Sequence, residues 1–330
     1  MKKLFLIWVL FFTSFFLHAQ VSFVSVVDED SHSKKEDFYH TFEYYIIPEK
    51  GQATKCQATR VGRKWFATAA HCVITACADK CTLRLDLLEE STSVFLDVTH
   101  TKKKEHVFIH PKYNPKVPAS YDFALLKIDP VSAYKSYYRR PTKDKKGQNV
   151  WISRQAFDNF LSKNSSARYA YKEVLSPSLP PLLVFEDSTR KVDRKLSVIS
   201  IFDGKRVILK NPNPTYYVKE LGFAYTDSFG VKKGMSGSGV MTNTGELAGI
   251  ISGHLGISNK EMEKEKQFFM FTAFNKSLME FMEQTMNSDY YKMERKSASP
   301  NYVLRTTKNH QQIINIVRLL SQGNDTIFVP

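Results

Sequence analysis

Short runs of β-branched and aromatic residues recur between residues 40 and 274, separated by polar residues, glycine or proline. Runs of this length and composition predict β-strands. Helical periodicity is scarce in this region, so the pattern indicates an all-β protein, either a sandwich or a barrel. The predicted strands are residues 42–47, 57–61, 65–69, 83–87, 94–98, 107–109, 123–128, 150–152, 182–185, 196–202, 206–209, 216–221, 239–242, 247–252 and 268–274.

A different pattern follows the last of these runs. Residues 275–286 carry apolar side chains at a helical spacing, at Leu278, Phe281, Met282 and Met286. The remaining residues, 287–330, begin polar and basic, and then predict a helix over 311–320 and a strand over 326–329.

The N-terminus predicts export. Lys2 and Lys3 precede an apolar run over residues 4–17, and the small residue Ala19 follows it. This arrangement is typical of a signal peptide cleaved after Ala19, and the alternative of an uncleaved anchor is disfavoured because the run is shorter than the ~20 residues that span a bilayer. We therefore expect a secreted or periplasmic protein with no membrane attachment after cleavage. Residues 20–38 are polar and partly acidic, and could form an arm or a propeptide.

Charge and cysteine content narrow the possible classes. The net charge of +14 could indicate a nucleic-acid partner, but the basic residues are spread out and no nucleic-acid motif accompanies them. Four cysteines in an exported chain favour disulfides, and their spacing lacks the paired pattern of common zinc sites. Arithmetic alone allows three pairings. His100, His106 and His110 have no carboxylate or cysteine to complete a metal site, so we expect no metal and no cofactor.

The candidate nucleophile is Ser236, in the stretch Lys-Lys-Gly-Met-Ser-Gly-Ser-Gly-Val at residues 232–240. Glycines on both sides allow a tight turn that exposes one hydroxyl and lets a substrate approach the main chain. In such a turn the amides of Gly234 and Ser236 could point together into an oxyanion hole. Loops rich in glycine and serine are common, so this turn alone is weak evidence.

Two further residues supply the groups that an activated serine requires. His71 follows an apolar strand among small residues, in Thr-Ala-Ala-His-Cys, and Asp122 lies at the start of a buried-looking strand. A buried carboxylate is unfavourable unless it is paired, and a histidine N–H is a suitable partner that the acid would orient. Alternatively, His71 is a structural histidine and Asp122 a turn residue.

Together these stretches resemble the chymotrypsin/trypsin family of serine endopeptidases, over about residues 40–286. The resemblance rests on their order: the stretch at His71, the run 110–114 leading to Asp122, the turn at Ser236, and Gly-Ile-Ile-Ser-Gly at 249–253. It implies two six-stranded antiparallel β-barrels, a C-terminal helix and an extra C-terminal tail. The first barrel would span residues 39–135. Residues 136–286 would hold a linker, the second barrel and the helix, and 287–330 the tail.

The resemblance also implies roles for individual residues. Ser236 would attack the scissile carbonyl, His71 would accept its proton, and Asp122 would orient His71. Ser252 would pair with the substrate backbone. A disulfide would join Cys56 to Cys72. Closing this loop would stabilise the fold by roughly 3 kcal/mol in the chain-entropy model. Cys77 and Cys81 would then pair with each other.

The sequence departs from the family's pattern at several positions, among them Ser238, which replaces the second glycine after the nucleophile. Met235 replaces the acid that binds a freed N-terminus in the family's digestive members, so we expect no activation by that ion pair. The predicted base of the specificity pocket holds Gly230 and Val231 and no acid, which does not support a preference for Lys or Arg. Lys232, Lys233 and His254 at the pocket rim could favour an acidic side chain, or the lysines could be solvated. The predicted substrate-binding residues are Gly230, Val231, Lys233, Ser252, Gly253 and His254.

The sequence thus favours a secreted, monomeric serine endopeptidase that hydrolyses protein or peptide substrates through an acyl-enzyme. An inactive homologue that binds a partner protein is the alternative, supported by the basic rim and the tail at 287–330. A nucleic-acid-binding module ranks third, and we expect no nucleic-acid partner.

Overall fold

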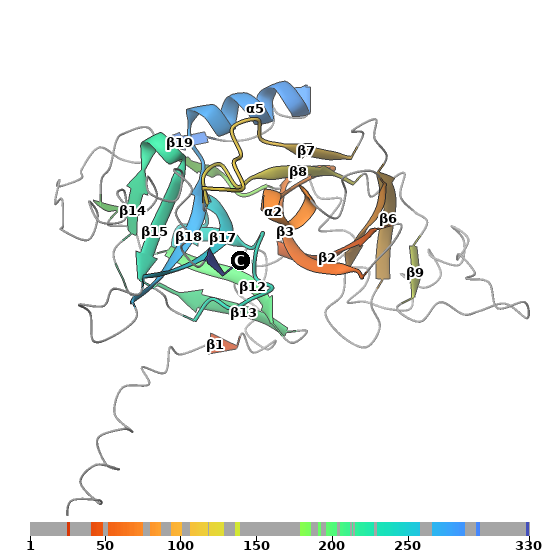
Figure 1. The fold of residues 1–330 in the computed structure, drawn as a ribbon, viewed down its shortest axis with the longest axis horizontal. Helices are drawn as coiled ribbons and strands as arrows, with labels where there is room; N and C mark the ends of the chain where they lie inside the picture. The colour runs from red at the N-terminus through yellow and green to blue at the C-terminus, as the bar shows by residue number, and fades with distance from the viewer. Residues whose placement is uncertain are drawn as a thin grey trace, which may run out of the picture.

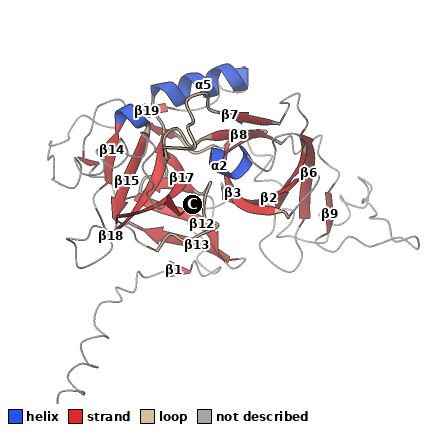
Figure 2. Ribbon diagram, in the orientation of Figure 1, coloured by secondary structure: helices blue, strands red, loops and turns tan. Residues whose placement is uncertain are grey.

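The computed structural model describes residues 25–26, 41–48, 52–74, 80–86, 94–100, 106–117, 119–128, 136–138, 179–185, 191–192, 196–202, 205–211, 213, 215–227, 230–257, 266–287, 295–297 and 328–329. Most of these residues lie in β-strands, which form two sheets side by side (Figure 2). Among them, no helix is long and apolar enough to cross a membrane.

The first sheet has the strand order β7-β8-β4-β3-β2-β5-β6-β9, and neighbouring strands in this order pair antiparallel. Alternate residues of β2, namely Phe42, Tyr44 and Ile46, turn to one face and pack with Leu83 and Leu85 of β5. The eight strands described are β2 (Thr41–Pro48), β3 (Thr54–Gly62), β4 (Trp65–Thr68), β5 (Cys81–Asp86), β6 (Val94–His100), β7 (Val107–Ile109), β8 (Ala124–Lys127) and β9 (Ser136–Tyr138).

The second sheet follows the order β1-β13-β12-β16-β17-β18-β15-β14-β11, with β10, β19 and β20 attached at its side. In β18, Phe269 and Phe271 face one core cluster, and Phe268 and Met270 face another. The twelve strands described are β1 (Ser25–Val26), β10 (Leu182–Val184), β11 (Lys191–Val192), β12 (Leu196–Phe202), β13 (Lys205–Lys210), β14 (Thr215–Val218), β15 (Phe223–Asp227), β16 (Gly239–Thr242), β17 (Leu247–Ile257), β18 (Lys266–Ala273), β19 (Arg295–Ser297) and β20 (Phe328–Val329).

Helix α5 (Lys276–Met286) lies over the junction of the two sheets (Figure 1). Its buried side chains join one core cluster with Trp65 of the first sheet and Ile199 and Ile250 of the second. Those side chains are Leu278, Met279, Met282 and Met286. The helix therefore fixes the position of one sheet relative to the other.

Asn275 caps this helix, because its side-chain oxygen accepts a hydrogen bond from the Leu278 amide at 3.0 Å. We expect Asn275→Ala to lower the free energy of unfolding by about 1–2 kcal/mol, the range for loss of an N-cap. Urea unfolding followed by circular dichroism would measure the change. Lys276→Ala is the control, since its 4.0 Å ion pair with Glu280 is exposed and should contribute little. Equal unfolding midpoints for the Asn275 variant and wild type would contradict this role.

The fold confirms the predicted all-β class with two barrels. The sheets described have eight and twelve strands rather than six each, and β10 pairs parallel with β17 and β19. Strand β15 was missed because the residues before it form a 3-10 turn (Lys219–Leu221) and then Gly222 in the left-handed region, which separate it from β14. Strand β9 extends the first sheet beyond residue 135. The short helix α2 (Ala70–Ile74) was also not predicted. Three predictions lie outside the described residues: the signal peptide at 1–19, the strand at 150–152 and the helix at 311–320.

Candidate active site

Ser236 lies in a turn of residues 232–238 that leads into β16. The Met235 amide donates to the Lys232 carbonyl at 3.2 Å, and the Ser238 amide donates to the Met235 carbonyl at 3.1 Å. Gly234 and Gly237 both have φ of +91°, a backbone conformation that favours glycine. The turn leaves Ser236 only 7% exposed.

Gly237 allows this turn to touch the first sheet. A Cβ at this position would lie 1.7 Å from the carbonyl oxygen of Gln57 in β3. The Thr59 hydroxyl donates to the Gly237 carbonyl at 3.1 Å, and the backbone N–H of Gln57 donates to the Ser236 carbonyl at 2.8 Å. A turn of the second sheet is therefore held in place by a strand of the first.

Some backbone N–H groups of the nucleophile turn donate hydrogen bonds within the protein, and others do not. The amides of Met235, Gly237 and Ser238 all donate to backbone carbonyls. Among the hydrogen bonds of the described residues, no acceptor pairs with the amides of Gly234 and Ser236. Two unused N–H groups in one tight turn are the donors that an oxyanion site requires.

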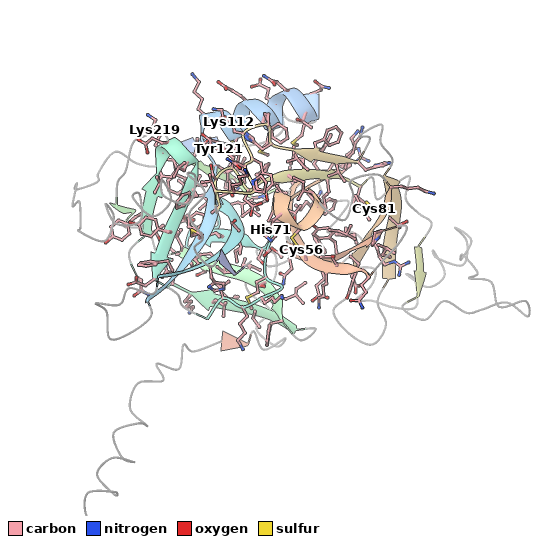
Figure 3. The ribbon with its side chains drawn as sticks, in the orientation of Figure 1. Cys56, His71, Cys81, Lys112, Tyr121 and Lys219 are labelled. Carbon is pink, nitrogen blue, oxygen red and sulfur yellow. A yellow bond between two sulfur atoms is a disulfide. The ribbon has the colours of Figure 1, made fainter. Side chains whose placement is uncertain are left out.

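His71 and Asp122 form a close pair within the first sheet and the loops that follow its strands. His71 is in α2, directly after β4, and Asp122 directly precedes Phe123 and β8. The ring Nδ1 lies 2.7 Å from Asp122 Oδ2, and the His71 backbone amide donates to Oδ1 at 2.9 Å. Asp122 is 2% exposed, whereas the His71 side chain is 21% exposed. Figure 3 shows His71 between the two sheets.

The environment raises the pKa of His71. Burial opposes the charged imidazolium, but the charge of Asp122 and its hydrogen bond to the ring favour it and prevail. The net shift is upward from the ordinary value of 6.5. The carboxylate thus strengthens the imidazole as a base and holds it through Nδ1.

The turn before Asp122 is strained. Ala119 and Tyr121 have φ of +57° and +48°, values uncommon for residues other than glycine. Tyr121 is held by the stacking of its ring on His110, with centroids 4.8 Å apart, and by its amide, which donates to the Leu221 carbonyl. Strain of this kind persists only where surrounding contacts impose it, and here it fixes the carboxylate that faces His71.

Ser252 connects the Asp122 pair to Ser236. Its hydroxyl donates to Asp122 Oδ2 at 2.5 Å, and its carbonyl accepts the Ser236 hydroxyl at 3.3 Å. Among the described contacts no hydrogen bond joins Ser236 Oγ to His71 Nε2, which lies 3.7 Å from Cys72 Sγ. The structure therefore brings His71, Asp122, Ser236 and Ser252 together, with the serine hydroxyl turned to Ser252.

The cysteine next to His71 is in a disulfide. Cys56 of β3 and Cys72 of α2 are bonded, with Cα atoms 6.5 Å apart. The bond ties α2 to the strand that also carries Gln57. Cys81 is disulfide-bonded as well, while Cys77 lies outside the described residues.

Gln57 is a buried residue that contacts the nucleophile turn, and the sequence did not reveal this role. Its side-chain NH₂ donates to the carbonyls of Ile201 (2.7 Å) and Gly234 (3.2 Å). Its oxygen accepts from the hydroxyls of Ser238 (2.6 Å) and Ser200 (3.0 Å) and from the Ile201 amide (3.0 Å). Gln57 is completely buried, so these bonds replace those it would make to water. The only sequence signal was a polar residue inside a predicted strand.

The predicted specificity residues differ in their surroundings. Val231 and Gly253 are buried, Gly230 is half-buried with φ of +96°, and Lys233 is exposed. Burial lowers the pKa of His254, although a hydrogen bond to the Val231 backbone opposes the shift. Its Nδ1 is buried without a hydrogen-bond partner among the described residues. The lowered pKa favours the neutral form of His254, so this residue adds no positive charge to the predicted pocket rim.

Met235 and Lys232 show how the turn is held without an acid at position 235. Met235 is 2% exposed and packs with Val231 and Val240 in the core of the second sheet. The Lys232 ammonium lies 4.4 Å from the centroid of the Phe202 ring, a favourable cation–π geometry. Apolar packing takes the place of an ion pair at this position.

Two further histidines within the described residues, His106 and His110, make contacts away from Ser236. The His110 ring packs between Tyr121 and Phe281, and burial lowers its pKa to about 4. His106 Nδ1 lies 2.9 Å from the Lys127 carbonyl. No group of His, Cys, Asp or Glu able to hold a metal occurs within the ranges described above.

Comparison with known proteins found a match between one family model and part of this chain. The trypsin family model matches residues 36–178, which include His71 and Asp122 but not Ser236. A solved structure titled "HL collagenase structure at 1.7 Å resolution" is 17% identical to this chain. That similarity covers 76% of this chain and 94% of the other chain, with a TM-score of 0.39. The family match therefore shows that residues 36–178 are similar to trypsin-like serine proteases.

Proposed function

We propose that the protein is a serine endopeptidase with Ser236 as nucleophile, His71 as general base and Asp122 as the orienting acid. The observation that carries the proposal is the buried Asp122 carboxylate, which accepts from the ring of His71 at 2.7 Å and from Ser252 at 2.5 Å. The Ser252 carbonyl in turn holds the Ser236 hydroxyl. The Asp122 carboxylate thus holds both His71, the proposed base, and Ser252, whose carbonyl accepts from the proposed nucleophile.

In the reaction, the Ser236 hydroxyl leaves the Ser252 carbonyl and donates to His71 Nε2. A rearrangement of this size is expected, because catalytic hydrogen bonds are often long or misaligned in the free enzyme. Ser236 Oγ attacks the scissile carbonyl while His71 accepts its proton. His71 then gives that proton to the departing amine as the carbon–nitrogen bond breaks, which leaves an acyl-enzyme. Water hydrolyses the ester with His71 again acting as base.

The negative charge that develops on the carbonyl oxygen needs donors that are already in place. We assign this role to the unused amides of Gly234 and Ser236. Gln57 supports the arrangement by donating to the Gly234 carbonyl, which holds the Gly234–Met235 peptide group that lies between the two amides. The first sheet therefore contributes to the oxyanion site as well as supplying the base.

The substrates are proteins or peptides, as the family implies. Gly230, Val231, Gly253 and His254 are proposed to line the binding site for the residue before the scissile bond. With no acid among them and a neutral His254, we expect no preference for Lys or Arg. Lys233 is the exposed positive charge proposed at the rim.

We further propose that residues 1–19 direct export and that the mature protein acts as a monomer. Its first barrel would span residues 39–135, to which β9 at 136–138 adds a strand, and its second barrel would lie within 136–286. Residues 20–38 would be an arm or a propeptide. The apolar N-terminal run and the disulfides, which form in oxidising compartments, support this proposal.

Hydrolysis of a mixed peptide library by the mature protein and by Ser236→Ala tests the proposal. We expect cleavage by the wild type and a loss of more than about 10³-fold in the variant, as for removal of a triad member. Thr215→Val is the control, because it removes a buried hydroxyl that accepts from Asn211, away from the nucleophile turn. A folded wild-type protein that cleaves nothing would instead favour the partner-binding homologue.

The dependence of kcat/KM on pH should report the pKa of His71. Protonation at low pH removes the base, so activity should rise with pH through a midpoint above 6.5. The lowered pKa values of His110 and His254 place their titrations below that midpoint. Initial rates at fixed ionic strength across pH 5–9 would measure the profile. A midpoint well below 6.5 would contradict the assignment of His71 as the base.

A further inference from the structure

The edge of β17 beside the candidate nucleophile is occupied by another part of the chain. Strand β20 (Phe328–Val329) pairs antiparallel with it, with Val329 opposite His254 and Phe328 opposite Leu255. Strand β20 lies beside β17 at the junction of the two sheets (Figure 1). Thus a segment from the far end of the sequence reaches the site.

The register shows which edge this is. A strand has two edges, and β18 takes one edge of β17 from Gly249 to Ile257. On the opposite edge, β16 pairs with β17 as far as Gly239 and Ile250. The nucleophile turn continues along that edge, since Gly237 donates to the Ile251 carbonyl and Ser236 to the Ser252 carbonyl. Strand β20 therefore follows the nucleophile turn on the same edge.

We infer that the segment ending in β20 is an intramolecular ligand of this edge of β17 and competes there with substrate. The inference rests on the proposed function. A peptide strand that kept the β20 register and continued toward the nucleophile turn would lie opposite Gly253 and then Ser252. Ser252 is the residue whose carbonyl holds the Ser236 hydroxyl. A substrate whose carbonyl reaches Ser236 along this edge would need the positions that β20 occupies.

The chemistry of both partners suits a strand addition. An open strand edge presents unpaired N–H and C=O groups, which an extended peptide satisfies through its main chain. The sequence Thr-Ile-Phe-Val at 326–329 is rich in β-branched and aromatic residues, which favour strands. The backbone pairing requires no particular side chain, so many substrates could displace the segment.

Covalent attachment makes even a weak contact effective. Strand β19 is anchored to β10 through Arg295–Ser297, and residues 298–327 separate it from β20. A segment tethered in this way is present at an effective concentration on the order of 1 mM. If the Kd of this contact is about 1 mM, the segment would occupy the edge of β17 in about half of the molecules. Removing the segment should raise kcat/KM at least twofold, through a lower apparent KM.

The test compares wild type with a variant lacking residues 328–330, and with Val329→Thr as a conservative control that keeps a β-branched residue. We expect the truncation to lower KM with kcat unchanged, and Val329→Thr to resemble wild type. A synthetic peptide of residues 325–330 should inhibit the truncated enzyme competitively, whereas a scrambled peptide should not. Unchanged KM after truncation, together with no inhibition by the peptide, would overturn the inference.

A second measurement separates this inference from the proposed function. Hydrogen exchange of the backbone amides at residues 253–257 should be faster in the truncated variant, whether or not the protein is a peptidase. Equal exchange would refute the intramolecular contact. The increase should not depend on protein concentration, whereas a contact with a second copy would weaken on dilution. If exchange changes as expected but no variant hydrolyses peptides, the proposed function fails and the strand contact stands.

Discussion

Replacing Asp122 with asparagine should reduce kcat by about 10⁴-fold, the loss typical of a triad whose orienting carboxylate becomes an amide. The amide cannot stabilise an imidazolium, and its NH₂ group can donate to Nδ1, which fixes the tautomer that carries its proton on Nε2. That tautomer cannot accept the proton of Ser236. Steady-state hydrolysis of a peptide identified by library cleavage would measure the loss.

The same variant changes the pH profile in a predictable direction. Without the Asp122 charge, burial is left as the largest influence on the imidazole, and it lowers the pKa of His71. The residual activity should therefore have its acid limb at lower pH than wild type. Asp227→Asn is the matched control, because that carboxylate is exposed at the end of β15. A loss of less than tenfold in the Asp122 variant would show that the pair does not drive the reaction.

Replacing Gln57 with methionine should have the second largest effect. The variant keeps a side chain of similar length but removes five hydrogen bonds, to Ile201 (two), Gly234, Ser200 and Ser238. Buried groups left without partners are unfavourable by about 1–3 kcal/mol each. We expect the free energy of unfolding to fall by about 4 kcal/mol or more, measured by urea denaturation.

Activity distinguishes a positioning role for Gln57 from a purely structural one. A turn displaced by a fraction of an ångström would move the Gly234 amide, so kcat should fall about 10- to 100-fold with little change in KM. Asn211→Leu is the control, because Asn211 is also buried and hydrogen-bonded, to Thr215 and Thr226, away from the nucleophile turn. Ser238→Ala, which removes one hydroxyl from the Gln57 oxygen, provides a milder test if the methionine variant does not fold. A folded Gln57 variant with wild-type kcat would contradict the positioning role.

The parts of the site that the sequence predicted are those with a local signal. His71, Asp122 and Ser236 each lie at the border of an apolar run, among small residues or glycines, and their order along the chain matches a known family. The strands were predicted from side-chain composition in the same way. Strand β15 was missed because the turn at Lys219–Leu221 interrupts the pattern.

The parts that could not be predicted depend on contacts between distant positions. Gln57 and Gly234 are far apart in the sequence, and a glutamine in a strand gives no indication that its partners lie in the other sheet. The strand predicted at 326–329 was found in part, as Phe328–Val329, but its pairing with His254 and Leu255 follows from the path of the chain. The neutral state of His254 likewise results from burial, which the sequence does not report.

The central claim is that Ser236 is an activated nucleophile, and labelling with a fluorophosphonate tests it most directly. The probe reacts with a serine hydroxyl only when a neighbouring base removes its proton. We expect one adduct per mature chain, located on Ser236 by mass spectrometry, absent in Ser236→Ala and strongly slowed in Asp122→Asn. Absence of labelling in the folded protein, both with and without residues 328–330, would contradict the claim, as would labelling that persists in Ser236→Ala.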